Sequence, residues 1–323
     1  MCTVISVVAG EHYFGRNLDY EHTFGEQVVI VPRRYPFTFT DDKLCSEHYA
    51  MIGMALPMKG YPLYFDAVNE RGLGMAGLNF PGNAHYIAPE KVKRNIASYE
   101  FIPRVLAQCA NVEEAETMLS DCCITDVCFS DEMKYSPLHW FMADKHRSVT
   151  IEQTEKGFMI YDNPVGVLTN NPTFDMQLFN LNNYHSVTSA EPQNIFSDKV
   201  NLATYSRGMG GLGLPGDLSS MSRFVKAAFT KLNSVFGETE EEKIHQFFHC
   251  LYSVYQQKGC VQVGHDFEMT NYSSCCNADK GIYYFTTYYN SSIRSVSMHH
   301  EDLYSNELIA FDLQDKGRIL SLN

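Results

Sequence analysis

Cys2, the residue after the initiator methionine, brings together two groups that can do chemistry as a unit. Removal of an initiator methionine is favoured when the second residue is small, and cysteine qualifies. The mature chain would then carry a free α-amine on the same residue as a thiol. An α-amine with a pKa of about 7.7 to 8.0 is partly neutral at physiological pH and can accept the proton of that thiol. We therefore expect Cys2 to be both nucleophile and base, with Met1 removed.

The first twenty residues predict a hairpin that begins at Cys2. Residues 2–8 (CTVISVV) are largely β-branched, and residues 12–20 (HYFGRNLDY) read as a returning strand. The turn signal between them contains Gly10. A turn centred on Gly10 places residue 18 opposite Cys2, and a turn longer by one residue shifts the partner to 19.

Arg16 and Asp19 fall beside Cys2 in either register, together with Asn17. A free cysteine ionises only near pH 8.5, so a nearby guanidinium is needed to favour the thiolate, and Arg16 can supply it. Asp19 can hold and orient the α-amine. The register stays open at this point, so the sequence does not tell which of Arg16 and Asp19 shares the face of Cys2.

Strand and helix patterns alternate in blocks along the chain, without a linker rich in Pro, Ser or Gly. This order predicts an α+β fold, a four-layer αββα sandwich of two antiparallel sheets flanked by helices, in a single domain over residues 1–323. Further strands are expected at 26–33, 49–55, 63–68, 72–80, 138–144, 148–154, 157–163, 165–169 (the last four as one meander), 281–290, 293–300 and 307–313. Helices are expected at 99–109 after a Ser98 cap, at 112–122 after a capping box of Asn111 and Glu114, and at 171–184, 221–236 and 239–258.

Composition narrows the class of protein. The net charge is -13, and no run of Lys or Arg is present, which argues against nucleic acid as a partner. No apolar segment reaches the roughly 18 residues of a membrane span, and the N-terminus lacks the features of a signal peptide, so we expect no membrane insertion and a cytoplasmic location. The ten cysteines lack a regular spacing or a CxxC pair, and most are expected to be buried free thiols.

Two motifs resemble binding sites but lack essential parts. The stretch 206–217 contains a GxGxxG pattern, yet no predicted strand leads into it and Pro215 interrupts the helix that should follow, so we expect a loop. His245 and His249 have the spacing of a zinc-binding helix, but Gln246 stands where the general-base glutamate belongs. We expect these histidines to be surface or partner residues.

Six stretches, in this order, carry a family resemblance: MCT, YFGRNLDY, NERGLGMAGLNFPG, GVLTNNPTFD, GLGLPGDLSSMSRF and YSSCCNADKGIYYFTTY. Together they run through almost the whole chain. They resemble the choloylglycine hydrolase family, which contains the bile salt hydrolases and the penicillin V acylases. The resemblance implies an N-terminal nucleophile (Ntn) hydrolase fold, with Cys2 as nucleophile and amine base and with no metal or cofactor.

The resemblance also implies the rest of the catalytic set. Arg16 and Asp19 match the family's two neighbours of the nucleophile, and Arg223 matches a further active-site arginine. Asn79 and Asn170 match the residues of the oxyanion hole, one acting through its backbone N–H and the other through its side-chain amide. Loss of one fixed donor to an oxyanion typically slows such a reaction by about 100 to 1,000-fold.

Conjugated bile salts are the substrates that the resemblance favours, because Asn79 in LNFPG is similar to the bile salt hydrolases, whereas penicillin V acylases tend to carry tyrosine there. Arg207, in the sequence SRG, resembles a loop associated with preference for taurine conjugates. A homotetramer is also implied. The family's steroid-facing positions correspond to apolar residues, namely Leu18, Met58, Phe129, Met133 and Leu138.

Three alternatives remain open on the sequence. The chain could act as an acylase on penicillin V or on acyl-homoserine lactones. It could be a non-catalytic protein that binds bile acids or lipids, as expected if Met1 were retained. A thiol redox role is disfavoured, because Cys2 has no evident resolving partner.

Overall fold

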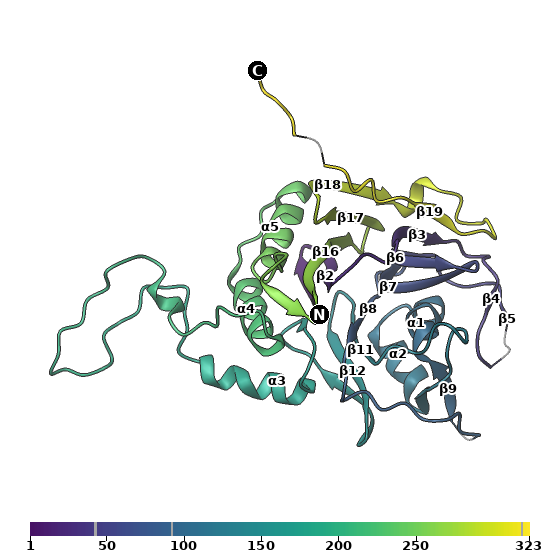
Figure 1. Ribbon diagram of the computed structural model, residues 1–323, viewed down its shortest axis with the longest axis horizontal. Coiled ribbons are helices and arrows are strands. Elements are labelled where there is room, and N and C mark those ends of the chain that lie inside the picture. Colours follow the sequence, from purple (N-terminus) through teal and green to yellow (C-terminus); the bar gives the residue numbers. More distant parts are fainter. Residues whose placement is uncertain (42–43, 92, 318) are drawn as a thin grey trace.

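The computed structural model describes residues 1–41, 44–91, 93–317 and 319–323, and its long strands form two antiparallel sheets (Figure 1). The first sheet has the order β14-β1-β2-β16-β17-β18, with β15 paired to β16. Its strands are β1 (Cys2–Ala9), β2 (Glu11–Tyr20), β14 (Val167–Leu168), β15 (Val261–Val263), β16 (Asp266–Asn277), β17 (Ile282–Thr287) and β18 (Asn290–Ser297).

The second sheet has the order β13-β12-β11-β8-β7-β6-β3-β19. Its strands are β3 (Gln27–Val31), β6 (Met51–Met58), β7 (Tyr61–Asn69), β8 (Gly74–Asn79), β11 (Leu138–Ala143), β12 (Ser148–Thr154), β13 (Gly157–Asp162) and β19 (Ile309–Phe311). Two small pairs complete the strands, β4 (Phe37–Thr38) with β5 (Leu44–Cys45) and β9 (Arg94–Ala97) with β10 (Cys122–Thr125).

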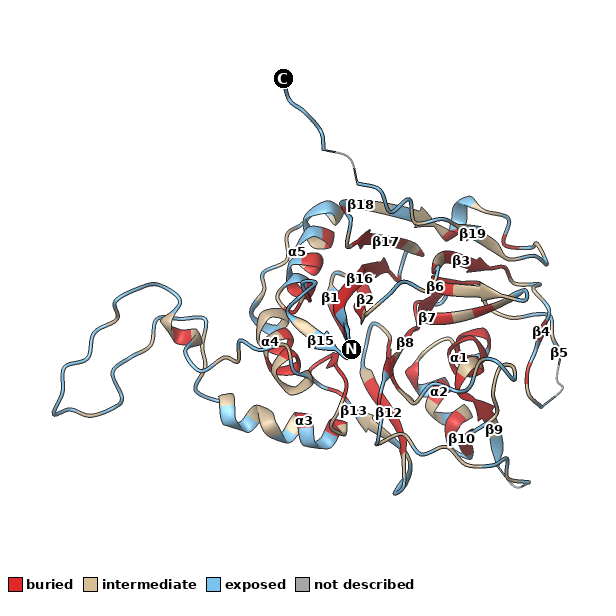
Figure 2. Ribbon diagram, viewed as in Figure 1, coloured by how far each residue is buried: buried red, intermediate tan, exposed pale blue. Residues whose placement is uncertain are grey.

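Helices cover the outer face of each sheet (Figure 1). The first sheet is covered by α4 (Ser220–Asn233) and α5 (Glu240–Tyr252), and the second by α1 (Phe101–Gln108) and α2 (Val112–Leu119). One apolar cluster fills the layer between the sheets and the layer beneath α4 and α5, and a second lies between the other sheet and α1 and α2. Figure 2 shows the buried residues concentrated in the two sheets. The predicted four-layer αββα sandwich is confirmed.

The hairpin β1–β2 adopts the shorter of the two expected turns. Gly10 has a φ of +79°, a left-handed conformation that glycine adopts without steric cost. Cys2 pairs with Leu18, and Val4 pairs with Arg16. Because both faces of this hairpin are covered, nearly all its residues are buried, which accounts for the almost continuous run of apolar and small side chains in β1.

Two strand expectations were wrong. Residues 165–169 were expected to end a meander, but β14 crosses to the first sheet, where Val4 pairs with Leu168. The strand β16, with twelve residues the longest of the first sheet, was not predicted at all. Its sequence, DFEMTNYSSCCN, is rich in polar residues that normally indicate loops, yet from Glu268 onward all of them are buried, and Thr270, Tyr272 and Ser274 donate to buried carboxylates.

The helix ends also differ from expectation. Ser98 begins a 3₁₀ turn (η1, Ser98–Glu100) without a side-chain cap, and α1 starts only at Phe101. Asn111 does cap α2, because its Oδ1 accepts from the N–H of Glu114 at 2.9 Å. The Glu114 carboxylate accepts from the backbone N–H of Ala110 and from the side-chain Nδ2 of Asn111, but not from the backbone N–H of Asn111, so the predicted capping box does not close.

Residues 185–219 form a long excursion from the body of the molecule (Figure 1). It follows α3 (Phe174–Asn180) and η2 (Leu181–Tyr184), contains the short η3 (Met209–Gly211), and ends at α4. Most of its residues are exposed (Figure 2). The glycine-rich stretch 206–217 is therefore a loop, as expected. No helix in the described part of the chain is long and apolar enough to cross a membrane.

Candidate active site

Strand pairing settles the orientation that the sequence left open. Side chains directly opposite each other in an antiparallel pair lie on one face, so Cys2, Leu18 and Arg16 share a face of the first sheet. This face looks toward the second sheet. Asp19 lies on the opposite face, toward α4 and α5. Cys2 itself is 5% exposed.

Arg16 reaches across the space between the sheets. Its Nη1 donates to the backbone oxygens of Phe65 at 2.8 Å and Gly77 at 2.7 Å. The carbonyl of Phe65 is available because β7 bulges there: Asp66 pairs with Met54 and Tyr64 with Ala55, which leaves Phe65 as the extra residue. The second terminal nitrogen of Arg16, Nη2, has no hydrogen-bond partner among the described residues.

The electrostatic surroundings of Arg16 keep its charge firmly in place. Burial lowers the pKa of the guanidinium, but the negative charges available on Cys2, Tyr272 and Asp66 outweigh that effect and raise the pKa above its usual range. A fixed cation on the face of Cys2 favours the thiolate. This arrangement is the one expected of a group that stabilises an anionic sulfur.

Asp19 is enclosed on the helix face. Its carboxylate accepts from Thr270 Oγ1 at 2.6 Å and from Gln256 Nε2 at 3.2 Å, and it lies 3.9 Å from Arg223 Nη1. Burial raises the pKa of Asp19, while Arg223 and the hydrogen bonds oppose the rise. Asp19 is thus a buried carboxylate with a cationic neighbour, close to the start of β1.

A bulge in β16 serves both faces. Thr270 pairs with Asp19 and Tyr272 pairs with Leu18, so Asn271 is the extra residue. Without it, Thr270 and Tyr272 would point to the same side, because side chains two apart share a face. With it, Thr270 meets Asp19 on the helix face, while Tyr272 enters the layer between the sheets.

The side chain of Asn170 joins the separate parts of the site. Its Oδ1 accepts from the backbone nitrogen of Cys2 at 2.8 Å and from Arg223 Nη2 at 2.7 Å, and its Nδ2 donates to the backbone oxygen of Asn79 at 2.7 Å. The two donors at one end and the acceptor at the other fix the amide orientation. One N–H of Nδ2 remains for a further acceptor.

The backbone of Asn79 faces Asn170 rather than the neighbouring strand β11. Leu138 stands opposite Asn79, but its N–H and C=O are both bonded to the Tyr86 hydroxyl, at 2.8 and 3.0 Å. In an antiparallel ladder such a pair directs its N–H and C=O groups outward. The N–H of Asn79 therefore points to the same side as the carbonyl that accepts from Asn170, as an oxyanion donor requires.

Arg223, on α4, clamps the beginning of β1. Its Nη1 donates to the backbone oxygen of Cys2 and to Thr3 Oγ1, and its Nε donates to the backbone oxygen of Leu218 at 3.0 Å. The side chain is fully buried, and burial lowers the pKa of its guanidinium, although Asp19 opposes the change. Arg223 thus fixes the backbone of Cys2.

Residues 2–311 match the model of the linear amide C–N hydrolases, choloylglycine hydrolase family. The chain belongs to the choloylglycine hydrolase family. Among its relatives are the bile salt hydrolase/transferase of Lactiplantibacillus plantarum, 52% identical over the full length of both chains, and that of Clostridium perfringens, 34% identical over 100% of this chain and 99% of the relative.

Solved structures agree with this membership. The mutant C2A conjugated bile acid hydrolase from Clostridium perfringens superposes with a TM-score of 0.92 at 34% identity, with 100% of both chains covered. The penicillin V acylase from Agrobacterium tumefaciens gives 0.76 at 20% identity, over 97% of this chain and 92% of that one, and this likeness concerns the fold. The Ntn hydrolase fold expected from the resemblance is confirmed, and as a family member the chain is an amide hydrolase.

In this choloylglycine hydrolase family member, Met1 occupies the space next to the candidate nucleophile. Its α-ammonium donates to the backbone oxygen of Asp19 at 2.6 Å and forms an ion pair with the buried Glu268. Burial lowers the pKa of this ammonium. While Met1 is attached, the nitrogen of Cys2 is a peptide nitrogen and cannot serve as a base.

The expected steroid-facing residues fall into two groups. Leu18 is buried opposite Cys2, and Leu138 is half-buried opposite Asn79. Met58, Phe129 and Met133 lie farther along, near the tip of the β6–β7 hairpin. Two contacts bring the 129–133 segment to this hairpin. The Phe129 ring lies 5.8 Å from the ring of Tyr61, which is the strand partner of Met58. Lys59, next to Met58, forms an ion pair at 3.9 Å with Glu132, next to Met133.

Arg207 is not brought to this site within one chain. It is exposed on the 185–219 excursion, which projects away from the body (Figure 1). A cavity of about 760 Å³ opens beside the N-terminus, and its lining includes Met1, Leu218 and Lys226.

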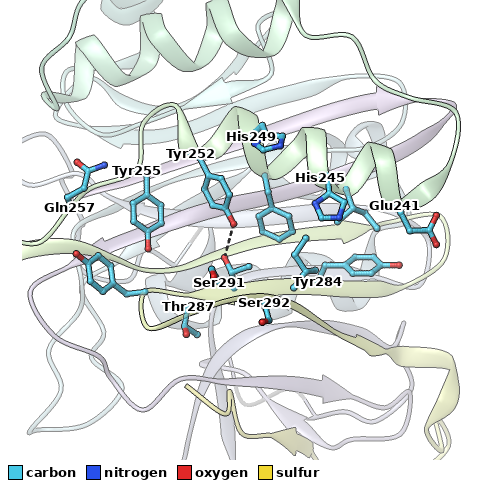
Figure 3. A pocket seen from close by; sticks show the side chains of 15 residues that line it. Glu241, His245, His249, Tyr252, Tyr255, Gln257, Tyr284, Thr287, Ser291 and Ser292 are labelled. Atoms are coloured by element: carbon cyan, nitrogen blue, oxygen red, sulfur yellow. Dashed lines mark hydrogen bonds between the residues drawn. The ribbon is translucent and has the colours of Figure 1, made fainter. Parts of the chain in front are cut away.

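A larger groove, of about 820 Å³, lies between α5 and the strands β17 and β18 (Figure 3). His245 and His249 line it, together with Tyr252 and Tyr255, and Tyr252 approaches Thr286 Oγ1 at 3.4 Å. The exposure of the two histidines agrees with the expectation that they are surface residues. None of the predicted catalytic or steroid-facing residues lines this groove.

Sequence reasoning missed the residues that surround the charged groups. Thr270, Gln256 and Tyr272 contact Asp19 or approach Arg16, and Glu268 contacts Met1. All but Gln256 lie on β16, so the failure to predict this strand hid them. The available signal was a run of Thr, Asn and Ser interleaved with Tyr and Cys directly before a clear strand, which is unusual for an exposed loop.

Proposed function

We propose that this choloylglycine hydrolase cleaves the amide bond of glycine- or taurine-conjugated bile salts once Met1 has been removed. The observation that supports this most directly is the Asn170 side chain, which contacts the nitrogen of Cys2, the guanidinium of Arg223 and the carbonyl of Asn79. A nucleophile, its base and two oxyanion donors thereby lie within one hydrogen-bonded unit.

The reaction begins when the Cys2 sulfur attacks the amide carbon and its proton passes to the α-amine. The oxyanion accepts the N–H of Asn79 and the free N–H of Asn170 Nδ2. The C–N bond then breaks, and the α-ammonium returns its proton to the departing nitrogen, which releases glycine or taurine. Water attacks the thioester, gives a proton to the α-amine, and releases the bile acid as the thiol re-forms.

Charged residues divide the supporting roles. Arg16 favours the anionic sulfur, because it lies on the face of Cys2 with Nη2 unpaired. Asp19 orients the α-amine from the helix face, and Arg223 holds the backbone on which both reacting groups are built. Neither a metal nor a cofactor takes part in these steps.

Bile salts are favoured as substrates by the relatives and by the apolar residues near the site. The relatives with 34% to 52% identity are named as bile salt hydrolases, and Leu18 and Leu138 lie directly beside Cys2 and Asn79. Penicillin V and acyl-homoserine lactones are the competing substrates. We expect kcat/KM on glycocholate or taurocholate to exceed that on penicillin V, and the reverse order would reject the substrate assignment.

Acyl transfer to amines is a second candidate activity, since several relatives carry the name hydrolase/transferase. The thioester on Cys2 reacts with a neutral amine as readily as with water in chemical terms, and the product is then a new amide. Incubation of a conjugated bile salt with a different amino acid, followed by mass analysis of the bile products, tests this activity.

Processing at Met1 decides between an enzyme and a binding protein. The α-ammonium of Met1 is held by Asp19 and Glu268, and Cys2 then has no free amine. We expect intact-mass analysis to show loss of Met1 in active protein. Hydrolysis of glycocholate by protein that fully retains Met1 would reject the amine as the base.

The proposal extends to the state of the molecule in the cell. All ten cysteines are free thiols, as suits a reducing compartment, and we propose a cytoplasmic enzyme. We also propose one domain over residues 1–323 and a homotetramer, following the family resemblance. Cell fractionation, limited proteolysis and light scattering after gel filtration test these three statements.

A further inference from the structure

Asp66 is a buried carboxylate that the proposed mechanism does not use. It lies on β7, is 1% exposed, and points across the inter-sheet layer. It accepts hydrogen bonds from the hydroxyls of Tyr272 at 2.6 Å, Tyr283 at 2.7 Å and Ser274 at 3.2 Å. Three hydroxyl donors around one carboxyl group are the surroundings of an ionised acceptor.

The charge balance of the interior links Asp66 to Arg16. Two arginines and three carboxylates are buried in this region: Glu268 pairs with the α-ammonium, and Asp19 is 3.9 Å from Arg223, which leaves Arg16 and Asp66. A buried guanidinium stays charged, and leaving it without an anion costs several kcal/mol. Burial raises the pKa of Asp66, while the charge of Arg16 and the hydroxyl donors oppose the rise. Asp66 is therefore the anion that balances Arg16.

Backbone geometry adds a second link. Phe65, whose carbonyl accepts from Arg16, is the bulged residue directly before Asp66. The hydroxyl groups of β16 and β17 donate hydrogen bonds to the carboxylate of Asp66. These bonds hold the bulge of β7 against the first sheet. A further chain runs from the backbone N–H of Arg16 to Ser274 Oγ at 3.2 Å and from Ser274 to Asp66.

We propose that Asp66 is a positioning residue for Arg16: it fixes the Phe65 carbonyl that orients the guanidinium, and it competes with the sulfur of Cys2 for the guanidinium charge. This rests on the proposed role of Cys2 as nucleophile. Because Asp66 draws on the charge of Arg16, it limits how far Arg16 favours the thiolate. Asp66 thereby sets the acid limit of the pH range in which Cys2 is reactive.

The charged and titratable groups around this network come from every neighbouring element. Those facing Asp66 are Arg16 on β2, Tyr272 and Cys276 on β16 and Tyr283 on β17. Those near Cys2 are Arg16, Arg223, Asp19, the α-amino group and Glu268, which pairs with that amino group. Only Asp66 can be neutralised on the inter-sheet face without removing Arg16 or the nucleophile.

The test measures the rate at which iodoacetamide alkylates Cys2 as a function of pH. Peptide mass analysis separates this reaction from that of Cys260, which is exposed, and of Cys45 and Cys128, which are partly exposed. In Asp66→Asn we expect the alkylation profile to move to lower pH by roughly half a unit to one unit, since a negative charge near the thiolate has been removed. In Tyr283→Phe the carboxylate keeps its charge but loses a donor, so we expect a shift of a few tenths of a unit to higher pH.

Tyr284→Phe is the matched control, because this neighbouring tyrosine donates instead to Glu240 at 3.0 Å, and its profile should coincide with that of the wild type. An unmoved profile in Asp66→Asn overturns the proposal, as does a downward shift in Tyr283→Phe. If Asp66→Asn does not fold, Tyr283→Phe decides alone: an upward shift supports the network, and no shift rejects it.

The alkylation assay contains no bile salt, so its outcome is independent of the substrate assignment. If the alkylation profiles shift as expected but the wild-type protein does not hydrolyse conjugates, the role of Asp66 is supported and the proposed function is rejected. If the wild-type protein hydrolyses conjugates but the alkylation profile of Asp66→Asn does not move, the proposed function is supported and the role of Asp66 is rejected.

Discussion

Each face of β2 buries an arginine, and the two arginines are neutralised in different ways. On the helix face, Asp19 and Arg223 lie 3.9 Å apart, and the guanidinium of Arg223 also donates to the backbone oxygen of Cys2 and to the side chain of Asn170. On the inter-sheet face, Arg16 donates to three backbone carbonyl oxygens and keeps Nη2 unpaired, while the carboxylate of Asp66 accepts from hydroxyl groups. In the proposed mechanism, the helix face fixes the nitrogen of Cys2, and the inter-sheet face leaves positive charge for its sulfur.

Replacing the residue between the faces has the largest expected effect. Cys2→Ala leaves both charge pairs intact and still permits removal of Met1, so stability should change little. We expect kcat/KM on glycocholate to fall by at least about 10⁴-fold, as for removal of other essential nucleophiles. Cys260→Ala, at an exposed thiol, is the control and should retain wild-type kinetics. Residual turnover above one tenth of wild type would contradict a cysteine nucleophile.

The helix face can be broken alone by Asp19→Asn. The change leaves the guanidinium of Arg223 buried without its anion, and we expect the free energy of unfolding in urea to drop by about 3 to 5 kcal/mol. Hydrolysis should also decline, because the nitrogen of Cys2 loses its orienting charge. If Asp19→Asn is as stable as the wild type, the interaction between Asp19 and Arg223 does not contribute to stability.

The inter-sheet face also contains a buried histidine, His12, at the other end of β2 from the residues beside Cys2. It is fully buried between Ser6 and Gly72, and burial lowers its pKa to about 4. The unfolded chain binds a proton near pH 6.5, so stability due to neutral His12 is present above that pH and is lost as pH falls toward 4. We expect this to amount to about 2 to 4 kcal/mol.

Unfolding in urea at a series of pH values measures this effect. His12→Gln should flatten the fall in unfolding free energy between pH 6.5 and 4. His22→Gln, at an exposed position, should leave the slope unchanged. An equally steep fall in His12→Gln would assign the acid sensitivity to other groups.

The smallest expected effect concerns the bulge of β16. Because of this bulge, the hydroxyl of Thr270 lies on the helix face of the sheet and that of Tyr272 lies on the inter-sheet face. Thr270→Val removes the hydrogen bond to Asp19, and Tyr272→Phe removes one to Asp66. Each should lower the free energy of unfolding by about 1 to 3 kcal/mol, the cost of a lost bond to a buried charge. The two losses should add in the double variant, because the bonds lie on opposite faces. Strong non-additivity would show that the faces are coupled.

Local pattern was enough to predict the first hairpin. Gly10 and the β-branched residues before it limited the partner of Cys2 to two positions, and this placed Arg16 and Asp19 beside it. The sequence could not choose between the faces, because that choice depends on a single residue of register.

Long-range partners were beyond local pattern. Asn170 and Arg223 are 168 and 221 residues away from Cys2 along the chain, and only family resemblance pointed to them. The bulges at Phe65 and Asn271 had no visible signal, because a bulge is defined by its partner strand. The polar strand β16 was missed for the related reason that its Thr, Ser and Tyr hydroxyls are satisfied by charges on other strands.

The peptide bond between Met1 and Cys2 is hydrogen-bonded on both sides in the folded chain. The carbonyl of Met1 accepts from the N–H of Asp19 at 2.9 Å, and the N–H of Cys2 is bound to Asn170. An aminopeptidase must draw this end of the chain into its own active site, which the completed sheet prevents. We therefore expect Met1 to be removed before the first hairpin closes; a chain that folds with Met1 still attached keeps Cys2 without a free amine until it unfolds.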